Sequence, residues 1–408
     1  MIFSLILVLV SCFRCLEATT FITTDSHVEP PLYQQPINEQ FEMLDLLDLG
    51  DRPQRLEQPN LRNSASKFLL EVYNEISESQ EPEEVLHQRH KRSVDDDILI
   101  SNEDRQEIAS CNSILTFSSR LKRNECHTDL HITFNTNDVP LDLTLVQAML
   151  RVYKQPSLDA GNQNLTISIY RRLYARQQDT NIVNYRILHS VNTTANFKGW
   201  LEFNLTQTLR FWLQHKTLEQ LQQGHEVRIS VTEADEVHLS ALDSGIMPPH
   251  SGLSSMEPYI VGYFNGPELL VKIQKLRFKR ELHKRKATLP SGMMKAPPVE
   301  HYRPPQSCER LNFTVDFKEL QMHNWVIAPK KFEAYFCGGG CNFPLGTKMN
   351  ATNHAIVQTL MHLKQPHLPK PCCVPTVLGA ITILRYLSED IIDLTKYQKA
   401  VARECGCH

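Results

Sequence analysis

The chain has 408 residues, a formal net charge of −3 and 22% charged residues. This near-neutral balance lacks the strong basic excess typical of nucleic-acid-binding proteins, and the sequence has no nucleic-acid-binding motif. Cysteine usage is uneven, because seven of the 11 cysteines lie within the last 101 residues. A cluster of this density indicates a disulfide-rich module made in an oxidising compartment.

The N-terminus has the features of a secretory signal. An apolar run at residues 2–10 is followed by small residues around Ala18, which predicts a signal peptide over residues 1–18 that carries Cys12 and Cys15. The run is too short to span a bilayer, and no other stretch has the apolar length of a membrane helix. A buried N-terminal strand is the weaker alternative, because the residues that follow are polar. We therefore expect a secreted, extracellular protein without a membrane span.

Sequons for N-glycosylation agree with the secretory route. Each acceptor asparagine needs a surface position in a secreted chain. The candidate acceptors are Asn164, Asn192, Asn204, Asn312 and Asn350.

Two basic motifs are candidate sites for the subtilisin-like convertases of the secretory pathway. The sequence Arg277-Phe278-Lys279-Arg280 fits the R-x-K/R-R pattern and precedes a change in composition. Cleavage after Arg280 would separate a prodomain of residues 19–280 from a C-terminal piece that holds all seven clustered cysteines. A second motif ends at Arg92 and would divide the prodomain. An ordinary solvated basic patch remains an alternative explanation for either motif.

Residues 281–307 are predicted to form a flexible basic arm, because they hold five prolines and no apolar periodicity. Residues 281–408 carry 16 lysine and arginine residues against 10 acidic ones. A patch at Lys284, Arg285 and Lys286 could favour weak binding to acidic matrix polysaccharides. Scattered solvated charge is the simpler explanation.

The region before this arm is predicted to be α+β, mainly β with N-terminal helices. Apolar residues at near-helical spacing predict helices over residues 41–50 and 68–76, which could pack on the C-terminal piece or on residues 105–270. From residue 108 to residue 273, short alternating segments predict strands, with a helical interval at residues 205–221. Cys111 and Cys126 have no assigned partners. Because no catalytic constellation is present and no cofactor motif appears, we expect a protein that is not an enzyme.

The C-terminal piece is predicted to be a small disulfide-rich β module over residues 308–408. Alternating apolar positions at residues 311–317 and 332–336 predict one hairpin, and residues 376–387 and 391–407 predict a second around a polar tip. An apolar stripe at residues 353–364, ending before Pro366, predicts an amphipathic helix. A module this small has little interior, so the stripe indicates packing against a second copy.

The spacing of six cysteines permits a cystine knot. The pairs that we favour are Cys308 with Cys373, Cys337 with Cys405, and Cys341 with Cys407. Two of these bonds would close a narrow ring of eight residues through which the third could pass, and the glycines between the cysteines lack the side chains that would crowd it. Spacing alone does not fix the pairs, because six cysteines allow 15 connectivities. A zinc site that includes His408 is the alternative, and its usual ligand spacing is absent.

Cys372 remains outside this scheme. Adjacent cysteines pair with each other only through a strained ring, so Cys372 is not expected to bond to Cys373. An odd cysteine in a secreted module suggests an intermolecular bond. We therefore expect a covalent dimer joined at Cys372.

Several segments of this module are distinctive. They are NWVIAP (324–329), CGGGC (337–341), FPL (343–345), MNATNHAIVQTL (349–360), PCCVPT (371–376) and CGCH (405–408). Together they resemble the transforming growth factor β superfamily, and within it the bone morphogenetic protein group. The resemblance implies a cystine-knot growth factor with two β-hairpin fingers and one helix. It also implies a dimer that gathers type I and type II receptor serine/threonine kinases on opposite faces.

The resemblance further implies which residues face the receptors. The positions that match the type I surface are Trp325, Phe343, Pro344, Leu345, Asn353, Ile383 and Tyr397, with Ile356 and Leu360 from the other protomer. The positions that match the type II surface are Ala328, Thr382 and Leu394. Each position is also explained as ordinary sheet surface or dimer core, since few interface residues carry most of the binding energy.

Three positions depart from the family pattern. Relatives usually have tryptophan at the position of Met322, an aromatic residue at Arg385 and an aliphatic residue at Asp393. A flexible methionine could still pack against a receptor, whereas the other two would place charge near the fingers. Our hypothesis is that receptor affinity is weaker or differently distributed, so that the chain acts best in a heterodimer with another bone morphogenetic protein-type ligand.

The favoured function is a secreted ligand that is cleaved by a convertase and acts as a homodimer or heterodimer on receptor kinases. Extracellular antagonists are further expected partners. The rival class is a secreted cystine-knot antagonist or matrix protein that sequesters ligands. A secreted metal-dependent hydrolase is a remote third reading, which lacks a general base beside the cysteines.

Overall fold

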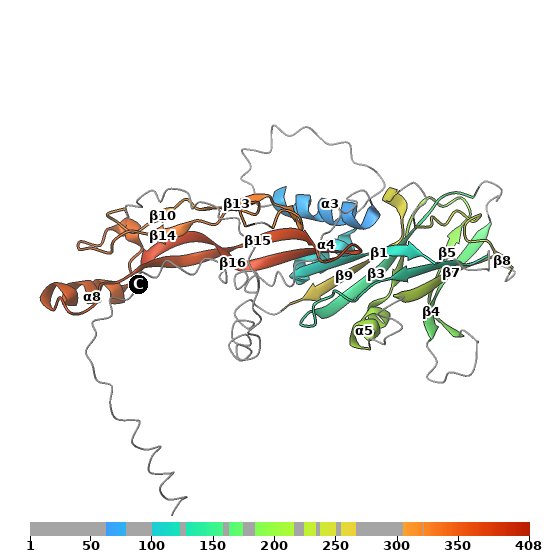
Figure 1. The fold of residues 1–408 in the computed structure, drawn as a ribbon, viewed down its shortest axis with the longest axis horizontal. Coiled ribbons are helices and arrows are strands. Elements are labelled where there is room, and N and C mark those ends of the chain that lie inside the picture. Colours follow the sequence, from blue (N-terminus) through green and yellow to red (C-terminus); the bar gives the residue numbers. More distant parts are fainter. Residues whose placement is uncertain are drawn as a thin grey trace, which may run out of the picture. The chain divides into compact units, whose positions relative to one another are not determined.

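Figure 1 shows the fold in a computed structural model of the chain. The structure describes residues 63–78, 100–122, 128–157, 163–173, 184–215, 224–233, 237–249, 254–266, 305–320 and 322–408. The signal peptide, the helix expected at residues 41–50, both cleavage motifs, the patch at residues 284–286 and Cys126 lie outside these ranges. Residues 51–408 form one compact unit by their contacts.

The N-terminal domain, residues 63–266, is built mainly from strands. They are β1 (Ser113–Leu121), β2 (Leu130–Phe134), β3 (Thr144–Lys154), β4 (Asn164–Leu173), β5 (Asn184–Thr194), β6 (Gly199–Asn204), β7 (His225–Glu233), β8 (His238–Leu239) and β9 (Tyr259–Asn265). One sheet pairs β1 with β9, β9 with β3 and β3 with β6, and a second pairs β1 with β2, β2 with β7, β7 with β4 and β8, and β4 with β5. Buried side chains such as Phe117, Ile169 and Phe203 form the core.

Helices and one 3-10 turn complete this domain. They are α3 (Ser64–Glu78), α4 (Asn102–Ser110), α5 (Thr206–Gln214) and η2 (Ser254–Met256). The side chain of Ser101 accepts from the amide of Asp104, whose carboxylate accepts from the Ser101 amide, and this reciprocal cap fixes the start of α4. Helix α5 begins one residue after the expected start and ends at Gln214, and residues 216–221 of the expected interval 205–221 lie outside the described part.

The C-terminal module is described at residues 305–320 and 322–408, where it has two hairpins and one short α-helix. Its elements are β10 (Glu309–Leu311), β11 (Thr314–Asp316), β12 (Val326–Ala328), β13 (Lys331–Glu333), β14 (Phe336–Gly338), η3 (Thr347–Met349), α8 (Asn353–Lys364), β15 (Cys373–Tyr386) and β16 (Ile391–Cys407). Each strand expected in the first hairpin is divided in two, and Tyr335, between β13 and β14, has a positive φ of 54°. Strands β15 and β16 pair along most of their length, as the sequence pattern predicts.

The second hairpin also joins the N-terminal domain through β-sheet pairing. Strand β16 pairs with β1 in antiparallel register, from Ser113 opposite Thr395 to Phe117 opposite Ile391. Helix α3 packs over this junction, and its Phe68 and Leu69 are fully buried beside β9 and the hairpin. On the sequence alone, the C-terminal piece and residues 105–270 are alternative packing partners for this helix. In the structure, α3 packs against both. No helix within the described residues is long and apolar enough to cross a membrane.

Candidate functional site: the cystine knot and the covered hairpin

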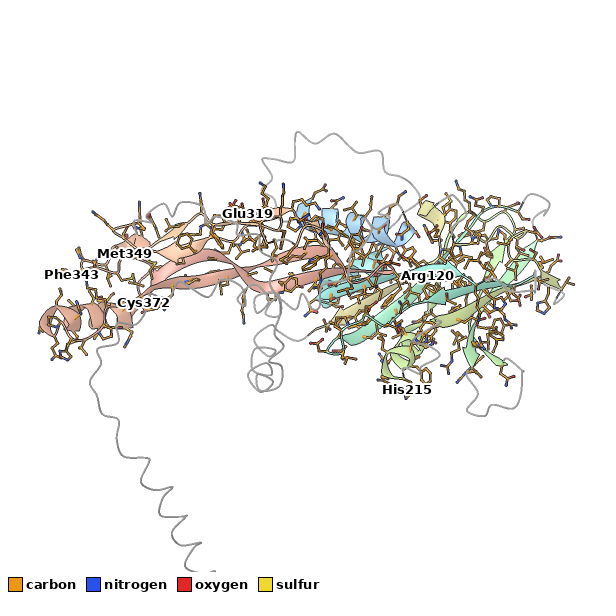
Figure 2. The ribbon with its side chains drawn as sticks, viewed as in Figure 1. Arg120, His215, Glu319, Phe343, Met349 and Cys372 are labelled. Carbon is orange, nitrogen blue, oxygen red and sulfur yellow. A yellow bond between two sulfur atoms is a disulfide. The ribbon has the colours of Figure 1, made fainter. Side chains whose placement is uncertain are left out.

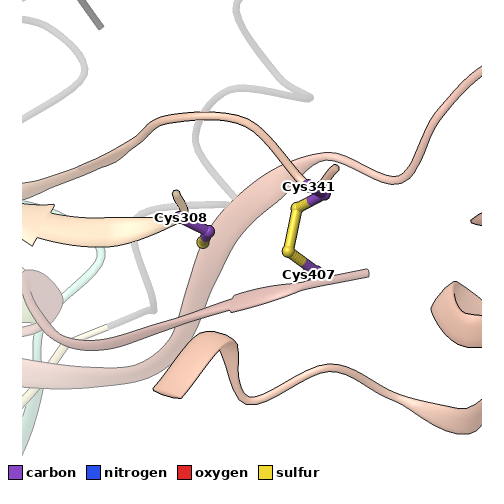
Figure 3. A group of neighbouring side chains, drawn as sticks. All are labelled: Cys308, Cys341 and Cys407. Atoms are coloured by element: carbon purple, nitrogen blue, oxygen red, sulfur yellow. A yellow bond between two sulfur atoms is a disulfide. The ribbon is translucent and has the colours of Figure 1, made fainter. Parts of the chain in front are cut away.

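Three disulfides hold the base of the two hairpins. Cys308 bonds to Cys373, Cys337 to Cys405 and Cys341 to Cys407, and the paired Cα atoms lie 5.4, 5.6 and 5.9 Å apart. Figure 3 shows the Cys341–Cys407 bond with Cys308 beside it. The sulfur atoms of Cys308, Cys341 and Cys407 lie within 4.8 Å of one another. Since all three are disulfide-bonded rather than thiolates, they do not offer the ligand set that zinc requires.

Glycine is required where the chain passes closest to the knot. Gly339 has a φ of +109°, and a Cβ atom there would lie 2.1 Å from the carbonyl oxygen of Ser307. Any residue with a Cβ is therefore disfavoured at position 339 for two reasons, the positive φ and the overlap with Ser307. Glycine at position 339 thus has a physical reason in the close approach of residues 307–308.

Cys372 is exposed and has no disulfide partner among the residues that the structure describes. Its backbone is fixed beside the knot, because its amide donates to the carbonyl of His408 and the amide of His408 donates to its carbonyl. In Figure 2, Cys372 and Phe343 lie at the α8 end of the second hairpin. The thiol is therefore held in a defined place and is open to another molecule.

Helix α8 turns an apolar face away from the module. Its N-cap is Thr352, whose side chain accepts from the amide of Ala355, and Ala355 and Thr359 are the buried residues that contact the knot side. The large apolar side chains on its other faces are exposed, and they are Ile356, Val357, Leu360, Met361 and Leu363. Such a patch on a short helix marks an interaction surface.

The residues matched to a type I surface divide into three groups. Phe343 (59% exposed), Pro344, Asn353, Ile356 and Leu360 are exposed, Leu345 and Tyr397 are partly exposed, and Trp325 and Ile383 are buried. Burial raises the pKa of the Tyr397 hydroxyl to about 12, so this group stays neutral at physiological pH. Only part of this surface is accessible in the uncleaved chain.

Two of the three residues matched to a type II surface are buried, and the third is partly exposed. Leu394 is 2% exposed and belongs to the apolar cluster that contains Phe68 and Leu69 of α3, and Ala328 packs against the same cluster. Thr382 is also buried. The uncleaved chain therefore does not present Leu394 or Thr382, whereas Ala328 is partly exposed at the edge of the cluster to which α3 contributes.

The expectation for Arg385 and Asp393 needs correction. Their side chains are 5% and 2% exposed, and the Arg385 Nε lies 2.7 Å from the Asp393 Oδ2. Burial alone would lower the pKa of Arg385, yet Tyr397 and Asp393 outweigh it and raise that pKa. The two residues therefore form a buried ion pair rather than separate surface charges. Each stands four residues from Glu389 at the hairpin tip, and this symmetry could have indicated the pair.

Met322 also differs from its expectation. Its side chain is 2% exposed, and its backbone bridges two segments, because its amide donates to the carbonyl of Phe317 and its carbonyl accepts from the amide of Val326. Met322 is therefore a core residue of the first hairpin here and is not available to a receptor.

A charged cluster that the sequence analysis missed positions helix α3. The buried Arg151 pairs with Asp104 of α4 at 2.6 Å and with Glu202 of β6 at 2.7 Å. Its guanidinium group also lies over the ring of Phe68, and the Tyr263 hydroxyl donates to Asp104 at 2.6 Å. No local sequence pattern predicts this cluster, because its members come from distant parts of the chain.

The five sequon asparagines are all exposed in the structure. Asn164 and Asn192 lie on the paired strands β4 and β5, Asn204 is the last residue of β6, and Asn312 and Asn350 lie in the C-terminal module. Each position therefore meets the surface requirement for glycosylation.

A β-rich domain whose strand and helix cover a disulfide-knotted module defines the precursor of a growth factor. The family description "TGF-beta propeptide" matches residues 32–263, and "Transforming growth factor beta like domain" matches residues 307–407. The chain belongs to the transforming growth factor β family.

Relatives place it near the bone morphogenetic proteins. Protein screw of Drosophila melanogaster is 71% identical over 404 residues, which cover 98% of each chain. Protein 60A of Drosophila melanogaster is 35% identical over 90% of this chain and 86% of its own length. Bone morphogenetic protein 8A of Homo sapiens is 29% identical over 90% of this chain and 89% of its own length. The chain is accordingly a ligand of the bone morphogenetic protein type, which implies secretion, and not an enzyme.

Proposed function

We propose that the chain is made as an inactive precursor, is cleaved after Arg280, and then signals as a dimer joined through Cys372. The dimer would bring type I and type II receptor serine/threonine kinases together. The observation that carries the proposal is the exposed thiol of Cys372, fixed beside a knot in which the six neighbouring cysteines are paired. The exposed apolar face of α8 supports it, because a second copy would bury that face.

The precursor form would be unable to bind type II receptors. Leu394 is buried in the apolar cluster that includes Phe68 and Leu69 of α3, so removal of the N-terminal domain would be required before a receptor could reach it. Residues 281–307 would then be the flexible arm of the released ligand. A second cleavage after Arg92 would divide the propeptide beyond α3, since α3 ends at Glu78.

The first test is the mass of the secreted C-terminal fragment on gels with and without reductant. Wild type should halve in mass on reduction, whereas Cys372→Ser should migrate as a monomer in both conditions. Cys111→Ser is the matched control, because Cys111 is the other free cysteine among the described residues and lies in the N-terminal domain. If wild type is monomeric without reductant, a noncovalent dimer or a monomeric binding module replaces the covalent dimer.

Receptor use is tested with the same variants. Purified dimer should bind both receptor ectodomains and raise kinase signalling in responsive cells, and an Arg280→Ala precursor should not. A precursor variant that signals as strongly as the cleaved dimer would contradict the requirement for cleavage.

We also propose that the chain acts best in a heterodimer with another bone morphogenetic protein-type ligand. The support is the altered second hairpin, where the Arg385–Asp393 pair, buried in the precursor, replaces apolar residues usual in the family. Homodimer and heterodimer are compared at equal concentration in one signalling assay, and equal potency would reject the proposal. Extracellular antagonists and acidic matrix polysaccharides are further proposed partners.

A further inference from the structure

Strand β1 places a hydroxyl on the buried ion pair of the second hairpin. The Ser113 Oγ donates to the Asp393 Oδ1 at 2.9 Å and lies 3.1 Å from the Thr395 Oγ1. Thr395 donates to the same carboxylate oxygen at 2.7 Å. The Arg385 Nε occupies the other oxygen. Asp393 therefore has donors from three side chains, and one of them belongs to the N-terminal domain.

Backbone register and side-chain chemistry agree at this point. Ser113 lies directly opposite Thr395 in the β1–β16 pair, and Asp393 lies directly opposite Arg385 in the β15–β16 pair. The side chains of Ser113, Asp393 and Arg385 are buried, with Ser113 2% exposed, and that of Thr395 is partly exposed. A buried carboxylate that lacks a donor is destabilising, because neither water nor a neighbouring group compensates it.

We propose that the Ser113–Asp393–Arg385 network is a specificity-determining contact by which the second hairpin recognises its own N-terminal domain. A strand with an apolar side chain at the position of Ser113 would remove one of the three hydrogen-bond donors from Asp393. The rest of the network would then be buried against an apolar side chain. The apolar neighbours Ile114 and Leu115 supply attraction that many strands could supply, whereas the hydroxyl selects for this strand. Buried polar groups of this kind fix pairing in other proteins.

The inference does not depend on receptor binding or on cleavage, so it is tested on the uncleaved secreted chain. Amide hydrogen exchange is measured by mass spectrometry for residues 113–117 and 391–397, with strands β4 and β7 as the internal reference. Ser113→Ala should speed exchange across the β1–β16 junction about tenfold or more, because a hydrogen bond to a buried charge is lost. Exchange in β4 and β7 should not change. Ser113→Thr, which keeps the hydroxyl, should restore slow exchange.

A double-mutant cycle separates recognition from general packing. The ion pair is replaced by apolar residues in Arg385→Leu/Asp393→Val, with and without Ser113→Ala. In that background, Ser113→Ala should have little or no effect, because the carboxylate that needed the hydroxyl is gone. An equal effect of Ser113→Ala in both backgrounds would overturn the proposal, as would no effect in the wild-type chain. If the apolar double variant is not secreted, the comparison of Ser113→Ala with Ser113→Thr decides alone.

Discussion

The guanidinium carbon of Arg151 lies 4.7 Å from the ring centroid of Phe68, and this contact joins helix α3 to the charged cluster of the N-terminal domain. Arg151 also forms ion pairs with Asp104 and Glu202. Phe68 in turn belongs to the apolar cluster that covers Leu394. A cation–π contact with a buried arginine thus helps to set the position of helix α3 over the second hairpin.

Arg151→Met should loosen α3 and destabilise the domain. The substitution leaves Asp104 buried without its cation, and removal of one partner of a buried pair costs about 3–5 kcal/mol. Urea unfolding of the precursor gives the loss of stability, and limited proteolysis within residues 64–78 should become faster. Arg105→Met is the matched control, because its pair with Glu75 also joins α4 to α3 but is about half exposed. That pair should contribute no more than about 1 kcal/mol, and equal losses in the two variants would contradict the assignment.

Acidification should weaken the same region. Burial opposes ionisation of Asp104, yet Arg151 and the Tyr263 hydroxyl outweigh burial and hold its pKa below the ordinary value of 3.8. A carboxylate with a lowered folded pKa stabilises the fold fully above its unfolded pKa and loses that contribution as pH falls through the folded pKa. The unfolding free energy of the precursor should therefore fall as pH drops below about 4. Asp104→Asn should flatten the dependence of the unfolding free energy on pH between pH 5 and 3. If the slope is the same as in wild type, groups other than Asp104 cause the loss of stability in acid.

Gly339→Ala should prevent formation of the native knot. The added Cβ would overlap the Ser307 carbonyl oxygen at 2.1 Å in a backbone conformation that side chains rarely adopt. We expect secretion of disulfide-bonded protein to fall sharply, as seen by gel mobility of the secreted fraction. Gly346→Ala is the control, because a Cβ there has no heavy atom within 4 Å. Normal secretion of Gly339→Ala would show that residues 306–308 can move away.

Local spacing predicted the parts of this fold that depend on near neighbours. The cysteine pattern and the apolar stripe of residues 353–364 led to the knot and to α8, because cysteine spacing and helix periodicity are local signals. The pairing of Ser113 with Thr395 could not be predicted in this way, since the two residues are 282 positions apart. The sequence showed that Arg385 and Asp393 depart from the family pattern and suggested two surface charges. The register of the hairpin, which places them opposite each other, shows that they form one pair.

Phe343 and Leu394 should respond differently to truncation, although both match receptor-facing positions. Phe343 is 59% exposed and Leu394 is 2% exposed in the precursor. Phe343→Ala should change the unfolding free energy of the precursor by no more than about 0.5 kcal/mol, whereas Leu394→Ala should reduce it by about 2–5 kcal/mol, because it leaves a cavity beneath α3. Urea unfolding measures both. After cleavage, Phe343→Ala should weaken type I receptor binding and leave type II binding intact, and Leu394→Ala should do the reverse. A Leu394→Ala precursor as stable as wild type would mean that α3 does not depend on this contact.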